Sequence, residues 1–228
     1  MNNLLDELIN NLDVRVILTI NVREDESFIK KYINNDRLLI IRNIKAKGFG
    51  QNHNHAFSLV KTKYFLVLNP DVEMNASIIS GLINLLEYKN AKLISPLSIN
   101  NQGFHSDNAR RFPSLLTPFK RLFYKKSEYS FSEKGIYDVD WISGMFMLFV
   151  SKLFRDIKGF DEQFFLYYED VDICKRISIL NERVLLTNKF IVKHHGARKS
   201  RKSFKYLLIH IHSMIKYHLK YLFSIANE

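Results

Sequence analysis

Apolar residues follow two spacings in the first part of the chain. Leu4, Leu5, Leu8 and Ile9 recur three and four positions apart, which predicts an amphipathic helix over residues 2–12. Residues 14–22 form a β-branched run typical of a buried strand. A short helix over 27–33, a strand over 37–42, a helix over 52–60 and a strand over 64–68 are expected next. This alternation predicts an α/β fold with a parallel or mostly parallel sheet.

The second half of the chain is less regular. We expect a helix over residues 75–88, a short strand over 93–95 and a loop-rich insertion over 100–135. A strand over 139–150, a loop running into a helix over 164–180 and one or two strands over 183–192 follow. Residues 201–225 read as a long, basic, amphipathic helix. We therefore divide the chain into a main domain, 1–200, and a C-terminal helix, 201–228.

Composition indicates one ordered globular domain, because 46% of the 228 residues are apolar and 25% are charged. The formal charge of +11 favours an anionic partner: a nucleic acid, a lipid headgroup or a phosphorylated small molecule. The basic residues concentrate in 110–126 and 198–220 and form no recognised nucleic-acid motif, so nucleic-acid binding is the less favoured interpretation. The single Cys174 excludes a disulfide framework and indicates a cytoplasmic protein. We recognise neither a secretory signal nor an apolar run long enough to span a bilayer.

A polar turn follows the buried strand over 64–68. Asn69, Pro70 and Asp71 stand directly after it, and ligands of open α/β sheets bind at this carboxyl edge. The alternative is ordinary turn chemistry, with Asp71 capping the next helix.

Three carboxylates crowd residues 169–172 behind an aromatic run. Burial near aromatic rings would raise the pKa of Glu169 or Asp170, which a general base can exploit. The alternative is an acidic helix N-terminus in which Asp172 pairs with Arg176. We favour that structural interpretation for Asp172 and the functional one for Glu169 and Asp170.

Two adjacent histidines end the last predicted strand. Since neighbouring side chains on a strand point to opposite faces, only one of His194 and His195 can face a site. The sequence leaves open which one, and whether it binds a metal or a phosphate.

Taken in order, these motifs resemble the large family 2 of glycosyltransferases, and most closely its bacterial rhamnosyltransferase-like members. The resemblance covers roughly residues 35–200. The segment from Gly159-Phe160-Asp161-Glu162 to Glu169-Asp170-x-Asp172 is highly specific. The other matching pieces gain weight from their order: Gly48-Phe49-Gly50 with Asn52, Asn54 and Ala56; Leu68-Asn69-Pro70-Asp71; Trp141-x-Ser143-Gly144; and His194-x-Gly196.

The resemblance implies an inverting GT-A glycosyltransferase with a Rossmann-like sheet. Such an enzyme moves a sugar, rhamnose at the family level, from a nucleoside-diphosphate donor to a saccharide or lipid-linked saccharide in surface polysaccharide synthesis. It implies Asp71 as ligand of Mg²⁺ or Mn²⁺, with Asn69 nearby and His194 as a further ligand. Asp170 is then the general base, and Glu169 is the second choice.

The remaining site residues come from the resemblance too. Gly48, Gly50 and Asn52 are expected at the nucleotide. Trp141, Ser143 and Gly144 are expected to border the sugar and the acceptor.

Two further expectations concern the ends of the motif region. Domains of this family open with an apolar strand that we do not find before residues 2–12, so we expect weak nucleotide binding. The main alternative function is accordingly a non-catalytic, degenerate glycosyltransferase-like partner subunit. At the other end, apolar residues of 201–225 form a stripe with lysines beside it, which predicts peripheral binding to an anionic inner membrane face or, alternatively, packing on the domain itself.

Overall fold

The structure, a computed structural model, describes residues 2–11, 13–23, 25–114, 129, 131, 133–196 and 203–225. Its helices are α1 (Asn2–Asn11), the 3₁₀ helix η1 (Ser27–Tyr32), α2 (Phe49–Phe57), α3 (Ser77–Tyr88), α5 (Ser151–Asp156), α6 (Glu169–Ile179) and α7 (Phe204–Ile225). Its strands are β1 (Val16–Ile20), β2 (Leu38–Arg42), β3 (Tyr64–Leu68), β4 (Val72–Glu73), β5 (Leu93–Ile99), β6 (Ala109–Arg110), β7 (Ile136–Asp138), β8 (Trp141–Ile142), β9 (Phe146–Val150) and β10 (Val184–His194).

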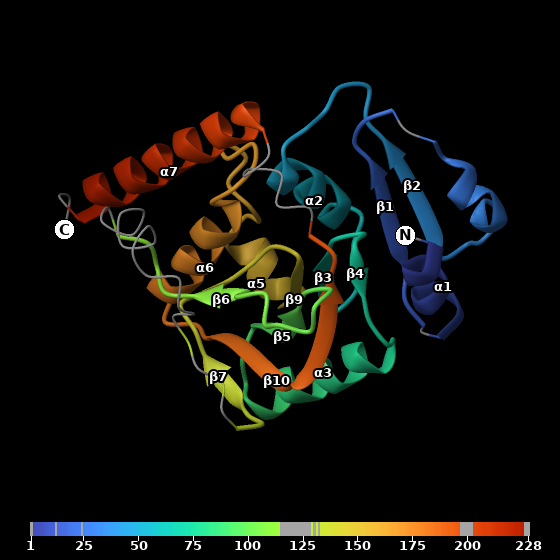
Figure 1. The fold of residues 1–228 in the computed structure, drawn as a ribbon, viewed down its shortest axis with the longest axis horizontal. Coiled ribbons are helices and arrows are strands. Elements are labelled where there is room, and N and C mark those ends of the chain that lie inside the picture. The colour runs from blue at the N-terminus through green and yellow to red at the C-terminus, as the bar shows by residue number, and fades with distance from the viewer. Residues whose placement is uncertain are drawn as a thin grey trace.

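The central sheet has the order β3-β9-β5-β10-β4, with β7 also paired to β10 (Figure 1). The pair β5 and β10 is parallel, whereas β9 runs antiparallel between β3 and β5. The expectation of a mostly parallel sheet is therefore wrong for this part of the fold. The predicted strand over 139–150 is broken by a turn at Gly144 and Met145, after which β9 runs antiparallel to β3 and β5.

The first two strands form a sheet of their own. β1 and β2 pair in parallel, and no strand of the described residues is hydrogen-bonded to the other edge of β1 or to the outer edge of β3. Helix α1 joins the two sheets: Leu5 and Ile9 pack with Tyr32 beside β1 and β2, while Leu4 and Leu8 pack on α3 and β3. The single continuous sheet that the alternation predicted is thus divided, and α1 buries apolar side chains on both parts.

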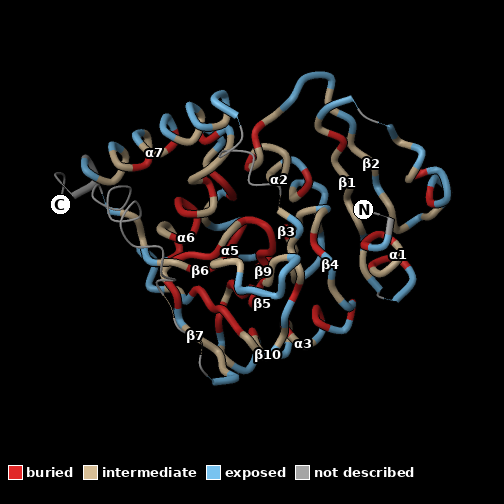
Figure 2. The backbone as a smooth tube through the Cα atoms, viewed as in Figure 1, coloured by how far each residue is buried: buried red, intermediate tan, exposed pale blue. Residues whose placement is uncertain are grey.

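The core lies around β5, β9 and α6, where buried residues gather at the centre of Figure 2. Phe149 of β9 packs against Phe154 of α5 with ring centroids 5.0 Å apart, and Phe154 lies 5.5 Å from Phe160. Large aromatic rings contribute much of the burial free energy of a core. Here they fix the segment that begins at Gly159 against the end of the sheet.

Most predicted elements are confirmed, including the helices over 2–12, 75–88 and 201–225 and the strand over 64–68. The sequence did not predict α5, β4, β6 or β7, because two to six residues are too few to show a period. Part of the predicted insertion, residues 115–128, lies outside the described residues, as does the predicted domain boundary at residue 200.

Candidate active site

Two strand ends bring Asp71 and His194 together. β4 pairs antiparallel with β10 so that His194 lies opposite Val72, one residue from Asp71. His194 Nε2 is 3.3 Å from Asp71 Oδ1, and its hydrogen bond holds the pKa of the Asp71 carboxyl below the usual range. His195 points elsewhere, with its Nε2 3.0 Å from Glu73 Oε2. Strand alternation therefore selects His194 for the site.

Backbone hydrogen bonds connect this turn to the acidic end of α6. The Asn69 amide donates to the Met145 carbonyl at 2.9 Å, and the neighbouring Gly144 amide donates to Asp170 Oδ2 at 3.0 Å. The residue after β3, the turn before β9 and the first turn of α6 thus meet at one edge of the sheet. This is the carboxyl edge of β3 and β10, where the sequence placed the site.

Glu169 and Asp170 differ in how their charged forms are supported. Burial, followed by the charge of Asp170, raises the pKa of Glu169 well above its usual value, and its Oε2 has no hydrogen-bond partner among the described residues. Burial also raises the pKa of Asp170, but the amides of Gly144 and Val171 and the charge of Arg110 oppose that rise. The pKa of Glu169 is therefore raised further than that of Asp170, so Asp170 is the carboxyl that ionises more readily.

The positive charge of Arg110 lowers the pKa of Asp170, an influence that the sequence did not predict. Arg110 of β6 pairs in register with Trp141 of β8, and its guanidinium lies 5.7 Å from the centre of the indole ring. Trp141 is anchored by its Nε1, which donates to the Arg111 carbonyl at 2.9 Å. The Ser143 amide donates to the Asn108 carbonyl at 2.9 Å, so the predicted insertion forms one wall of the site. The adjacent arginines 110 and 111 could have indicated a site residue in the sequence. Two basic residues in a loop-rich segment usually lie on a solvated surface, however, so the pair did not single out Arg110.

The predicted nucleotide residues lie in a second polar group. Asn52 Oδ1 accepts from Asn43 Nδ2 at 2.7 Å, and Asn43 also donates to Asn21 Oδ1 at 2.9 Å. Asn21 and Asn43 directly follow β1 and β2, so these amides lie at the carboxyl edge of the smaller sheet.

The glycines around 48–50 have a packing role that the structure makes explicit. A Cβ on Gly48 would lie 2.8 Å from the Phe165 carbonyl oxygen, and one on Gly50 would lie 2.6 Å from Phe160 Cβ. The close approach lets α2 rest directly on the aromatic segment that leads to Glu169. Their contact with a nucleotide stays a prediction.

The motif that begins at Gly159 consists largely of residues with a structural role. Gly159 has φ +66°, and a Cβ there would lie 2.3 Å from Asn54 Oδ1, which itself accepts from the Phe160 amide at 2.9 Å. The Asp172–Arg176 pair expected from the helix spacing is present at 2.8 Å. Most of this motif therefore builds the support for Glu169 and Asp170.

Comparison with known proteins agrees with this geometry. Residues 2–155 match the model of the glycosyl transferase family 2. The chain belongs to that family. The rhamnosyltransferase WbbL of Escherichia coli K12 is 30% identical over 183 residues, which are 75% of this chain and 69% of WbbL. An N-acetylglucosaminyl-diphospho-decaprenol L-rhamnosyltransferase of Mycobacterium tuberculosis is 28% identical over 151 residues, 60% of this family 2 chain and 48% of the relative.

The architecture of this family 2 chain is a GT-A fold. It superposes on the crystal structure of GalNAc-T7 with UDP, GalNAc and Mn²⁺ with a TM-score of 0.64 at 14% identity, covering 85% of this chain and 40% of that one. The predicted family and the predicted GT-A fold are thereby confirmed, apart from the strand directions corrected above.

The buried pair generates a prediction about stability. The pKa of Glu169 is higher in the folded than in the unfolded protein, so folding favours the protonated carboxyl. The contribution of this carboxyl to the free energy of unfolding is therefore complete below about pH 4.5 and is lost as the pH rises through the raised pKa. Glu169→Gln keeps a neutral group at every pH and should raise the melting temperature at pH 8 but not at pH 4. Thermal unfolding at the two pH values is the measurement, with the exposed Asp36→Asn as control. A lower melting temperature of Glu169→Gln at pH 8 would contradict the assigned ionisation.

Proposed function

We propose that this protein transfers a sugar from a nucleoside-diphosphate donor to a hydroxyl of a saccharide or lipid-linked saccharide, with inversion at the anomeric carbon. The proposal rests on one observation: Asp170, next to the buried Glu169, lies at the same sheet edge as the Asp71–His194 pair. Membership of family 2 supports it. We do not favour the alternative of a non-catalytic partner subunit, because Asp71, His194 and Asp170 lie at one edge of the sheet, which supports a catalytic role.

Asp170 acts as the general base. Its ionised form accepts hydrogen bonds from the amides of Gly144 and Val171, at 3.0 and 2.9 Å, and these hold the carboxylate in one orientation. Asp170 takes the proton of the acceptor hydroxyl while the hydroxyl oxygen forms a bond to the anomeric carbon. The bond from that carbon to the donor diphosphate breaks on the opposite face, and the diphosphate leaves with the electron pair. Buried and protonated, Glu169 is a poorer base.

The residues around Asp71 fit a divalent cation. The Asp71 carboxylate is ionised, is 39% exposed and lies beside an imidazole nitrogen. Among the described residues no cluster of three or more such ligands occurs, so the protein would supply Asp71 and His194 and leave the remaining positions to phosphate oxygens and water. When bound, Mg²⁺ or Mn²⁺ neutralises the negative charge that develops on the departing diphosphate.

Polar and basic groups at the two sheet edges suit the rest of the donor. We assign the nucleotide to the amides around Asn52 and the backbone at Gly48 and Gly50. The guanidinium of Arg110 lies where it can stabilise developing negative charge near Asp170. Trp141, Ser143 and Gly144 then border the sugar and the acceptor.

The names of the relatives support a surface-glycan reaction. Both rhamnosyltransferases are named for that sugar, and the mycobacterial name includes a lipid diphosphate. The chain spans 69% and 48% of the length of these relatives. Rhamnose as the transferred sugar and a lipid-linked saccharide as acceptor in polysaccharide or lipopolysaccharide synthesis are accordingly part of our proposal.

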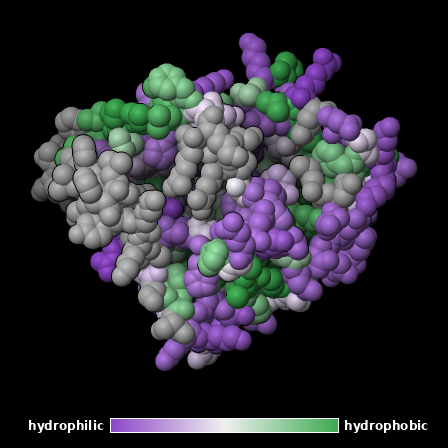
Figure 3. Space-filling model, viewed as in Figure 1, coloured by the Kyte–Doolittle hydropathy of each residue, from purple (hydrophilic) through white to green (hydrophobic). Residues whose placement is uncertain are grey.

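Helix α7 supports binding to a membrane surface. Seven of its large apolar side chains are exposed, from 39% for Ile211 to 74% for Phe204, and they colour the upper left of Figure 3 green. None of the described helices is long and apolar enough to cross a membrane. Because the chain carries a charge of +11, we propose that this stripe docks on an anionic bilayer at the cytoplasmic face.

The lysines of α7 behave differently from the expectation. Lys205 is exposed, whereas Lys216 donates to the Gln163 carbonyl at 2.8 Å and Lys220 pairs with Asp161 at 2.7 Å. One face of the helix therefore packs on the domain, as the second interpretation of the sequence predicted, while the apolar stripe on the other face is exposed.

The first test of this function is loss of the base. Asp170→Asn should lower kcat by on the order of 10²–10⁴ while donor affinity stays the same, because the base acts on the acceptor. Transfer from a nucleoside-diphosphate sugar and calorimetric titration of the donor measure the two effects. Glu169→Gln is the comparison, and a deeper loss in that variant would exchange the two roles.

The second test concerns the cation. Asp71→Asn should abolish Mn²⁺-dependent transfer and remove the rise in melting temperature that Mn²⁺ gives with nucleoside diphosphate. Stability without ligand should change by at most about 1 kcal/mol, as for an ordinary surface substitution. Glu73→Gln, which removes the carboxylate beside His195, is the matched control. If Asp71→Asn kept the Mn²⁺-dependent shift, Asp71 would not be a ligand.

The third test is flotation with vesicles of anionic phosphatidylglycerol or neutral phosphatidylcholine. Leu208→Ser combined with Ile215→Ser should weaken binding to anionic vesicles at least about tenfold, since each side chain contributes roughly 1–2 kcal/mol when buried. Leu180→Ser, at a similarly exposed leucine outside α7, is the control. If the unsubstituted protein did not float with vesicles but formed dimers, and the double variant were monomeric, the stripe would bind a second copy of the chain instead.

A further inference from the structure

The turn before Glu169 has an unfavourable backbone conformation. Tyr167 and Tyr168 both have φ +68°, in the left-handed region that non-glycine residues rarely adopt. Tyr168 occupies the N-cap position of α6, so its conformation sets where Glu169 and Asp170 begin. A residue keeps such a conformation only when the contacts around it hold it in place. For Tyr167 and Tyr168, two sets of contacts do this.

One set of contacts comes from the buried face of α7. Ser213, 2% exposed, donates from its hydroxyl to the Leu166 carbonyl at 2.9 Å. The Tyr168 ring lies 5.3 Å from the ring of Tyr217 and 5.5 Å from that of His210, centre to centre. The residues immediately before the carboxylate pair are therefore held by a helix that lies more than thirty positions later in the chain.

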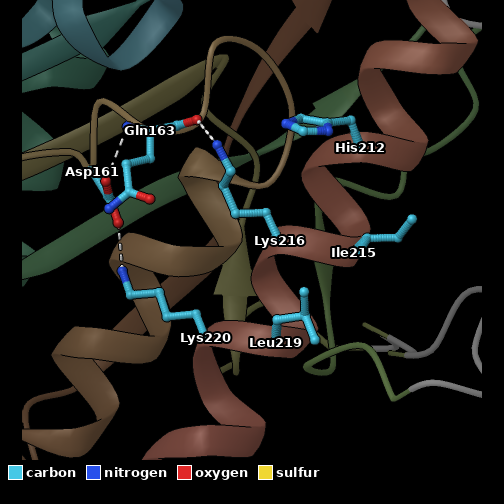
Figure 4. A pocket seen from close by; sticks show the side chains of 7 residues that line it. All are labelled: Asp161, Gln163, His212, Ile215, Lys216, Leu219 and Lys220. Carbon is cyan, nitrogen blue, oxygen red and sulfur yellow. Dashed lines mark hydrogen bonds and ion pairs between the residues drawn. The ribbon is translucent and has the colours of Figure 1, made fainter.

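A second set holds Asp172, two residues after Asp170. Lys220 Nζ donates to Asp172 Oδ1 at 2.6 Å and to Asp161 Oδ2 at 2.7 Å, and the Tyr221 hydroxyl donates to the same Asp172 oxygen at 2.9 Å. The Asp172 carboxylate is fully buried. Figure 4 shows Lys220 and Lys216 reaching from α7 across an open groove of about 450 Å³ to Asp161 and Gln163. A buried charge with these partners has little freedom to move.

We propose that α7 is a positioning element for the reaction, in which Ser213 and Lys220 hold the turn that orients Glu169 and Asp170. Helix α7 contacts the chain on both sides of Glu169 and Asp170, at Leu166–Tyr168 and at Asp172, while its apolar stripe faces outward. The chemical role of the pair rests on the proposed function, whereas the restraint on the turn is a property of the fold.

Two variants with a matched control test this role. Lys220→Met removes the ammonium but keeps the alkyl stem, and Lys220→Arg restores a cation. Ser213→Ala removes one hydrogen bond and serves if Lys220→Met folds poorly. Lys205→Met makes the same lysine-to-methionine change at an exposed position of α7.

Steady-state kinetics and amide hydrogen exchange supply the readouts. Lys220→Met and Ser213→Ala should lower kcat by about 10–100-fold with an unchanged donor KM, because misplaced reacting groups affect the chemical step and not ground-state binding. The amides of residues 166–172 should exchange faster in both variants. Lys220→Arg should recover part of the rate, and Lys205→Met should match the unsubstituted protein.

The outcomes are distinguishable. Unchanged kcat per folded molecule and unchanged exchange at 166–172, with only a lower melting temperature, would overturn the positioning role. If the unsubstituted protein transferred no sugar, the proposed function would fail. Faster exchange confined to 166–172 would then still support the restraint by α7, and a uniform increase across the chain would refute it.

Discussion

The Gly144 amide donates a hydrogen bond to Asp170, and this contact connects the parts of the molecule that carry chemistry. Gly144 stands in the turn between β8 and β9, and β9 is paired along its length with β3, whose end leads to Asp71. A Cβ at 144 would lie 3.7 Å from Asp170 Cβ, an ordinary contact, but only 3.1 Å from the Phe49 ring, which would have to shift to admit a larger residue. The bond also lowers the cost of a buried negative charge, which distinguishes Asp170 from Glu169.

Around this contact, one group of residues packs to form the base of the site, and a different, smaller group carries the candidate reactive side chains. Phe149, Phe154 and Phe160 form the aromatic base, and Gly48 and Gly50 let α2 approach the segment that leads to α6. Asp71 lies in the turn between β3 and β4, His194 ends β10 and Arg110 ends β6. Much of the family motif between Gly159 and Asp172 is therefore explained by packing and ion pairs, which hold a small number of reactive groups in place.

Helix α7 extends this arrangement to the surface. Its inner face contacts the chain on both sides of the carboxylate pair, and its outer face is an apolar stripe. On our proposals, one helix would hold both the reacting carboxylate and a membrane surface, which would bring the site close to a lipid-linked acceptor. Helix α1 likewise uses two faces: one packs on β1 and β2, and the other packs on β3 and α3, so that it connects the two sheets.

The sequence alone determined the helices and strands with a clear period, the family, and the set of polar residues at the strand ends. Periodicity and motif order are local properties, so they survive without a structure. It could not determine that β9 runs antiparallel, that the first two strands form their own sheet, or that Arg110 pairs in register with Trp141, because these depend on pairing between distant segments. The family resemblance had already named His194 and ranked Asp170 before Glu169. The register of β10 with β4 supplies a geometric reason for the first choice, and two amide donors supply one for the second. Lys216 and Lys220 looked like solvent-facing charges beside an apolar stripe, and only packing showed that they bind Gln163 and Asp161.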